Sequence, residues 1–295
     1  MATRLRGFHI TDRDLEILRT LDMLPLTAEQ LHRWSSRFLQ PFTDVRFARR
    51  RLKVLTDARL VRRWPLAIAT DVGGAPFYYK LTPQAHRLLW GDDIAFPRKR
   101  AFAPIGVARH YHTLNLTDFV IHTAVAAHRA GIGFVDFSPE NAYPIRIGEE
   151  TIWPDGRFTL QTAQGQRIYT IELDQSTESI MSPRDSDSIG RKIRLIDDDQ
   201  VGKAVDDPTR YCTIFVSTRS RQRLTNILHA ASEIVRNPHR LMFCGVYLPD
   251  FLSDSHAVTS ACLLDQLDQP FALAPAELLS QPQHRRQQVA TAVGV

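Results

Sequence analysis

The stretch Val45-Arg-Phe-Ala-Arg-Arg-Arg-Leu-Lys-Val-Leu-Thr-Asp-Ala58 combines an apolar stripe with a dense row of cations. At 100° per residue along a helix, the apolar side chains share an arc of about 80°. They are Val45, Ala48, Leu52 and Leu55. The cations share a separate arc of about 100°, and they are Arg46, Arg49, Arg50 and Lys53. We expect a helix that packs by one face and presents an acid-free basic face to a duplex, because a helix fits the DNA major groove and cations bind phosphates.

Two helix starts lie before this basic helix. Thr11 followed by Asp14 predicts one, and Thr27-Ala-Glu-Gln30 is a capping-box pattern that predicts another. The chain between them contains Pro25, which ends the first helix. The basic helix is therefore the third of a set.

A hairpin is predicted directly after the basic helix. Residues 60–68 and 77–81 are strand candidates around a turn at 71–76, and Pro83 opens a further helix. Three helices followed by a hairpin are typical of a winged helix-turn-helix, with Arg62 and Arg63 at the base of the wing. The alternative is a winged helix that binds protein, such as a dimerisation module.

The C-terminal part reads as an α/β body. A helix is predicted over 108–130 and another over 221–235, with strands at 134–137, 152–160, 168–174, 213–217 and 241–246. We expect an α/β (α+β) fold in two domains: a winged helix-turn-helix over 1–95 and a mixed-sheet domain over 108–275. Residues 96–107 are predicted to be a linker, and 276–295 a flexible tail.

The hairpin at 152–174 gathers carboxylates. If Gln164 and Gly165 form its two-residue loop, Asp155 lies opposite Asp174, and Glu172 points to the same face. Carboxylates that converge repel one another, and a divalent cation such as Mg²⁺ relieves this. The sequence therefore predicts a metal site of Asp155, Glu172 and Asp174; the alternative is that these acids only end strands and turns. His110 and His112 lack a zinc-site spacing and are predicted to cap a helix start instead.

Charge is distributed unevenly over the 295 residues. Residues 1–110 hold 20 Lys/Arg and 10 Asp/Glu, whereas the remainder holds 17 and 22, within a net charge of +5. A basic first part suggests a polyanion partner. No apolar run reaches the length of a membrane span, no signal peptide is expected, and three cysteines without zinc-site spacing fit a reducing cytosol. A cytoplasmic protein is expected.

The carboxylates resemble a known nuclease core. Pro154-Asp155 followed by Glu172-Leu173-Asp174 is similar to the PD-(D/E)xK motif of restriction endonucleases. The resemblance implies that Asp155 and Glu172 bind Mg²⁺ or Mn²⁺, and that a Lys two positions after the Glu activates water. Here Asp174 takes that Lys position. In some members the Lys lies on a following helix, where Lys192 would substitute for it, with Glu140 as an auxiliary acid.

The chain as a whole resembles the replication-relaxation family of plasmid replication and mobilisation proteins. The matching features are the basic winged helix ending in Leu81-Thr-Pro-Gln-Ala-His86, a helix containing His112, Pro154-Asp155-Gly156, and Glu172-Leu-Asp-Gln-Ser-Thr-Glu178 before a basic helix. The similarity covers roughly residues 10 to 250. It implies action on plasmid DNA near origins of replication or transfer.

Two functions stay open at this point. The first is a DNA-binding protein of plasmid or mobile-element replication or conjugative mobilisation that nicks or cleaves DNA with a divalent ion, using Asp155, Glu172, Asp174 and Lys192. The second is a non-enzymatic DNA-binding regulator whose degenerate nuclease domain mediates homodimerisation; Asp174 in the Lys position favours it. Both have double-stranded DNA as partner and no membrane, and both allow contacts with other plasmid replication or transfer proteins.

Overall fold

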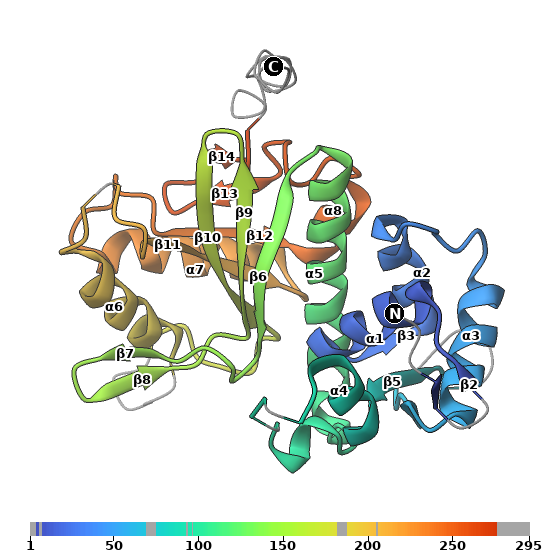
Figure 1. The fold of residues 1–295 in the computed structure, drawn as a ribbon. Coiled ribbons are helices and arrows are strands. Elements are labelled where there is room, and N and C mark those ends of the chain that lie inside the picture. Colours follow the sequence, from blue (N-terminus) through green and yellow to red (C-terminus); the bar gives the residue numbers. More distant parts are fainter. Residues whose placement is uncertain are drawn as a thin grey trace, which may run out of the picture.

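The computed structural model describes residues 4–5, 8–68, 75–92, 94–95, 97–181, 188–204 and 206–275 (Figure 1). The predicted tail at 276–295 and most of the predicted turn at 71–76 lie outside the described residues. Helices and strands alternate through a mixed α/β architecture with one large sheet, as the fold class predicted from sequence requires. Among the described residues, no helix combines the length and the apolar character needed to cross a membrane.

The N-terminal part contains the predicted helices and hairpin. Its elements are β1 (Arg4–Leu5), β2 (Phe8–His9), α1 (Asp12–Met23), β3 (Leu26–Thr27), α2 (Ala28–Trp34), α3 (Val45–Asp57), β4 (Val61–Pro65), β5 (Phe77–Leu81) and α4 (Pro83–Trp90). Strand β3, which the sequence did not predict, pairs with β5 and makes a three-stranded sheet in the order β3-β5-β4. The hairpin is therefore attached to the helices by backbone hydrogen bonds as well as by packing.

Local sequence explains where these helices begin. Thr11 and Thr27 each accept a hydrogen bond from the third helical residue, which in turn bonds back to the cap, so both capping boxes form. Asp44 caps α3 by accepting from the Arg46 backbone N–H at 2.7 Å. Three residues of the predicted inner stripe of α3, Ala48, Leu52 and Leu55, are fully enclosed in the core, and the fourth, Val45, is partly buried against it.

The C-terminal part is a seven-stranded mixed sheet in the order β14-β13-β12-β11-β10-β9-β6. Its strands are β6 (Gly133–Pro139), β9 (Gly156–Thr162), β10 (Gly165–Asp174), β11 (Tyr211–Ser217), β12 (Phe243–Tyr247), β13 (Leu263–Asp265) and β14 (Pro270–Phe271). Its helices are α5 (His110–Arg129), α6 (Ile189–Gln200), α7 (Arg221–Ile234) and α8 (Leu248–Ser253), and a separate ribbon pairs β7 (Ile145–Ile147) with β8 (Glu150–Ile152). Short 3₁₀ turns occupy Ser35–Arg37, Lys99–Ala101 and Val107–Arg109.

Helices cover both faces of this sheet. On one face α5 and α8 pack against aromatic side chains that include Phe158 and Tyr169. On the other face α6 and α7 pack against Phe215 and Phe243. Alternation along β10 therefore sends Tyr169 toward α5 and Glu172 toward α6. Figure 1 shows α5 standing between the sheet and the N-terminal helices.

The two parts share one hydrophobic core. Trp34 of α2 meets Phe134 of β6 edge to face, with ring centroids 6.5 Å apart. Gln30 donates a hydrogen bond to Asp118 of α5 at 3.0 Å, and Arg33 forms an ion pair with the same carboxylate. The contacts of α2 with α5 and β6 therefore fix the position of the N-terminal helices relative to the large sheet. The predicted domain boundaries stay predictions.

The predicted hairpin register is wrong by two residues. The loop is Ala163-Gln164 rather than Gln164-Gly165, and Gly165 begins β10 with a positive φ of 135°, opposite Thr162. The ladder ends with Ile171 opposite Gly156, so that Asp155 lies level with Glu172 and not with Asp174. A shift of two keeps each side chain on its predicted face, which preserves the grouping of Asp155 with Glu172.

Candidate functional site

A pocket of about 380 Å³ opens where β10 ends. Its walls come from the first turn of α5, the bend before β9, the end of β10 and the first turn of α6. Ionisable side chains dominate it: Arg109, His112, Glu140, Asp155, Glu172, Asp174, Glu178 and Lys192. The predicted catalytic and metal residues all line this one space.

Asp155 is fixed by the neighbouring strand. Its backbone N–H donates to the Ile171 carbonyl at 2.9 Å, and its Oδ2 accepts from the Leu173 N–H at 2.8 Å. The next residue, Gly156, lies close to the Ile171 side chain, because an added Cβ at this position would be 3.1 Å from it. One carboxylate oxygen is thus anchored to β10, while Oδ1 faces the pocket and His112.

Glu172, which is buried, forms an ion pair with the partly buried Lys192 in the pocket lining. Lys192 Nζ of α6 lies 3.0 Å from Glu172 Oε2 and 3.2 Å from Glu178 Oε2. Burial raises the pKa of Glu172 to about 7, which the Lys192 charge opposes and the Asp155 charge reinforces. Burial lowers the pKa of Lys192, but Glu172 and Glu178 raise it overall, so this ammonium stays charged.

Asp174 is engaged by an arginine. Arg223 of α7 bonds both of its oxygens, from Nε at 2.7 Å and from a terminal nitrogen at 2.8 Å. The Asp174 side chain is only 4% exposed. A bidentate, charge-assisted pair of this kind holds the carboxylate in place and neutralises it. Asp174 therefore reaches the pocket as half of an ion pair, as Glu172 does with Lys192, but its partner Arg223 lies outside the pocket lining.

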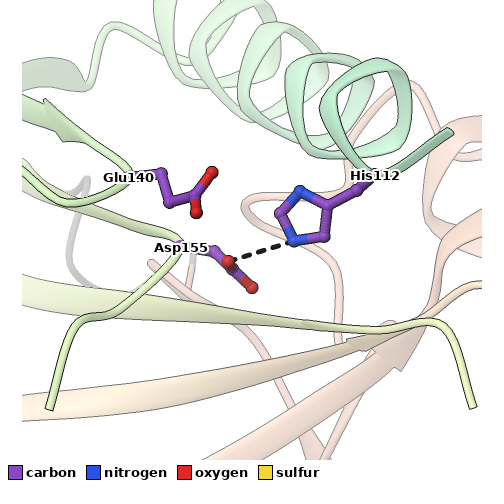
Figure 2. A group of neighbouring side chains, drawn as sticks. All are labelled: His112, Glu140 and Asp155. Carbon is purple, nitrogen blue, oxygen red and sulfur yellow. Dashed lines mark ion pairs between the residues drawn. The ribbon is translucent and has the colours of Figure 1, made fainter. Parts of the chain in front are cut away.

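His112 and Glu140 complete the acid cluster on its other side. Figure 2 shows the imidazole of His112, on α5, near the carboxylates of Glu140 and Asp155, which come from the turn after β6 and the bend before β9. His112 Nε2 lies 3.0 Å from Asp155 Oδ1, and one potential ligand atom from each of the three residues lies within 4.8 Å of the others. Arg109 pairs with Glu140 Oε2 at 2.5 Å.

The predicted capping role of the histidines is wrong. The N-cap of α5 is Arg109, which makes no side-chain cap hydrogen bond. His110 is buried, accepts from the Ala67 N–H at 2.8 Å and contacts the Ile105 carbonyl, so it joins the region after β4 to the start of α5. His112 faces the carboxylates instead. The sequence suggested Glu140 as an auxiliary acid to Asp155, but no spacing rule connects His112 to either of them, so the place of His112 in this group was not predicted.

The basic face of α3 is exposed as predicted, but it is not free of acids. The side chains of Arg46, Arg49 and Lys53 are 81%, 56% and 72% exposed. Each has an acidic partner: Asp44, Glu29 and Asp57 respectively. Asp57 lies on the same helical face, one turn after Lys53, while Glu29 reaches across from α2. Exposed ion pairs of this type contribute little to the free energy of folding.

A sequence profile of the replication-relaxation family matches residues 15–194. This chain belongs to that family. No curated protein and no solved structure matches the chain. The matched range runs from α1 into α6, so it includes the α3 surface together with His112, Glu140, Asp155, Glu172 and Lys192. Replication-relaxation membership indicates a role in plasmid replication or mobilisation.

In this replication-relaxation protein, the two arginines that the sequence predicts at the base of a wing, Arg62 and Arg63, do not share one face of β4. Arg63 lies over the Phe77 ring, 4.6 Å from its centroid. Burial raises the pKa of Tyr79, and the positive charges of Arg63 and Arg49 partly oppose this rise, so both arginines lie near the Tyr79 hydroxyl. Strand alternation turns Arg62 to the opposite side, the side of Trp64. Arg63 therefore continues the α3 basic surface, and Arg62 does not.

Proposed function

We propose that this replication-relaxation protein binds double-stranded DNA near plasmid or mobile-element origins and nicks or cleaves it with Mg²⁺ or Mn²⁺. The observation that carries the proposal is the convergence of Asp155, Glu172 and Lys192 in one pocket at the end of β10. Two acids and one lysine are the components of a PD-(D/E)xK site, with the lysine supplied from α6.

The donor set of the pocket fits a divalent ion. Asp155 Oδ1 faces the pocket, and Glu172 is buried beside it in a site where burial and the Asp155 charge raise its pKa to about 7. Hard divalent cations prefer such carboxylate oxygens. A bound ion would lower the pKa of its water and offset charge on the phosphoryl group.

The chain's own residues would orient the substrate around that ion. Asp155 and Glu172 would hold the metal, and the hydrogen bond from the Leu173 N–H fixes the Asp155 carboxylate for that role. Lys192 stays charged and would donate from Nζ to a phosphate oxygen or to the attacking water. We assign Asp174 a positioning role through Arg223, which bonds both its carboxylate and the Glu178 carbonyl.

DNA recruitment belongs to the winged helix in this proposal. The exposed face of α3 would enter the major groove with Arg46, Arg49, Arg50 and Lys53, and Arg63 would contact the backbone beside it. Arg50 makes no ion pair within the part of the chain that the structure describes, so it meets a phosphate without first losing a partner. Such a partner implies a cytoplasmic site of action.

A nicking assay on supercoiled plasmid tests the proposal. Wild-type protein with Mg²⁺ or Mn²⁺ should convert supercoiled to open-circular or linear DNA, whereas Asp155→Ala and Glu172→Ala should not. Glu149→Ala is the matched control, because this acid is exposed in the β7–β8 turn, away from the pocket lining. Cleavage that survives loss of both Asp155 and Glu172 would contradict the assignment.

The alternative function is a DNA-binding regulator or accessory factor with a degenerate, dimerising nuclease domain. Two observations favour it. Lys192 already bonds two carboxylates, and Asp174, the acid in the usual lysine position, is paired with Arg223. Tight duplex binding with no cleavage under any divalent ion, by a protein that sediments as a dimer, would establish this function instead.

A further inference from the structure

We propose that His112, Glu140 and Asp155 form a site for a divalent transition-metal ion, distinct in its ligands from the Asp155–Glu172 pair. The inference deepens the proposed function and rests on it for the role of the ion in cleavage, because Asp155 belongs to both sets. The binding of the ion itself depends only on the geometry of these three side chains.

The positions of the three side chains suit one ion. Ligands that lie about 2.1 Å from a metal at right angles are about 3 Å apart. His112 Nε2 and Asp155 Oδ1 are 3.0 Å apart, and the Glu140 oxygen lies within 4.8 Å of the others. Glu140 follows β6 in a turn, so a small side-chain rotation would bring its carboxylate into the coordination sphere.

The site is partly enclosed and pre-positioned. The side chains of His112 and Asp155 are 16% and 17% exposed, and Asp155 is held by the Leu173 N–H. His112 Nδ1 is buried and has no hydrogen-bond partner among the described residues. Imidazole nitrogens are common ligands for transition metals. Nε2, the ring nitrogen beside Asp155, is therefore the ligand atom that the imidazole offers to the cluster.

Arg109 supplies the positive charge that an ion would replace. Its guanidinium pairs with Glu140 Oε2 at 2.5 Å, from the residue that precedes α5. The Arg109 side chain is half exposed, so it can leave Glu140 at little cost. Binding of a metal would then release Arg109 into the pocket, where it lies in reach of a phosphate.

The donor set selects the class of metal. One nitrogen and two carboxylates suit Mn²⁺, Fe²⁺, Co²⁺ or Zn²⁺, whereas Mg²⁺ takes oxygen ligands and keeps its waters. At such a mixed site affinity rises from Mn²⁺ to Co²⁺ along the first-row series. The site therefore predicts a preference for transition ions over Mg²⁺ that an all-carboxylate pair would not show.

Metal binding to the tag-free full chain, without DNA, tests the inference. Isothermal titration with Mn²⁺ and Co²⁺ should give affinities at least tenfold tighter than with Mg²⁺. The electron paramagnetic resonance spectrum of bound Mn²⁺ should show coupling to an imidazole nitrogen. His112→Gln should remove that coupling and weaken Mn²⁺ binding at least tenfold while changing Mg²⁺ binding less than threefold. His128→Gln, exposed near the far end of α5, should change neither.

Several results would overturn the inference. Equal affinity for Mg²⁺ and Mn²⁺, the absence of nitrogen coupling, or Mn²⁺ binding that is unaffected in His112→Gln would each do so, and none of them bears on nicking by Asp155 and Glu172. If His112→Gln does not fold, Glu140→Gln takes its place, and unchanged Mn²⁺ affinity in that variant would equally refute the site. Selective loss of Mn²⁺ binding in a protein that never cleaves DNA would support the site and refute the proposed function.

Discussion

Replacing Arg46 and Arg50 together with alanine should weaken duplex binding and flatten its dependence on salt. Both side chains lie on the exposed face of α3, on the side opposite the buried stripe. Neither packs in the core, so the variant should unfold at the wild-type denaturant concentration. A loss of DNA affinity can then be assigned to the missing charges.

The expected size follows from the number of phosphates contacted. Each contact contributes about 0.9 to the slope of log K against log salt, so two lost contacts reduce the slope by about 1.8. If the two proteins bind equally at 1 M salt, this change in slope corresponds to about a 60-fold loss of affinity at 0.1 M salt. Arg46 must first leave Asp44, whereas Arg50 makes no ion pair within the described ranges, so Arg50→Ala should account for the larger share.

Fluorescence anisotropy with a labelled duplex at four or five salt concentrations measures both quantities. Arg129→Ala is the control for Arg50→Ala, because it also removes one positive charge from an exposed position, here at the end of α5. An unchanged slope and affinity in the double variant would refute the assignment of α3 as the recognition helix. Equal losses for Arg50→Ala and Arg129→Ala would show a general charge effect instead.

Three further outcomes are expected from denaturant titrations. In the presence of a chelator, the free energy of unfolding should fall by about 3 kcal/mol as pH rises from 4.5 to 7. Burial raises the pKa of Glu172 to about 7, so the folded state holds the proton more tightly than the unfolded state. Glu172→Gln should flatten this pH dependence, and a variant with the same pH dependence as the wild type would contradict the prediction. Leu52→Ala should cost about 2–5 kcal/mol because the side chain is fully buried, whereas Lys53→Ala should stay within about 0.5 kcal/mol; similar costs would argue against the orientation of α3. Asp174→Asn should cost about 3–5 kcal/mol because Arg223 loses its only ionic partner among the described residues, and Asp174→Asn with Arg223→Met should recover most of this cost; wild-type stability of the Asp174→Asn variant would rule out the positioning role.

The local patterns of the sequence determined the elements that surround the candidate surface. The apolar stripe and the cations of α3 repeat with the period of a helix, so Leu52 packs inward and Arg50 faces out. Thr27 with Gln30 forms the predicted capping box, and Phe77–Leu81 is a strand as predicted. Each of these follows from interactions between residues a few positions apart, which is why periodicity and capping rules detect them.

The tertiary structure decided how the predicted acids are spaced in the pocket and that His112 joins them. The turn of the β9–β10 hairpin falls one residue earlier than predicted, because Gly165 takes its positive φ at the first position of β10 and not inside the loop, and this sets Asp155 level with Glu172. His112 reaches Asp155 only because α5 packs against the large sheet. Figure 1 shows this helix between the sheet and the N-terminal helices. Periodicity states which face of an element is buried, but the distance between side chains on different elements depends on register and on how the layers pack.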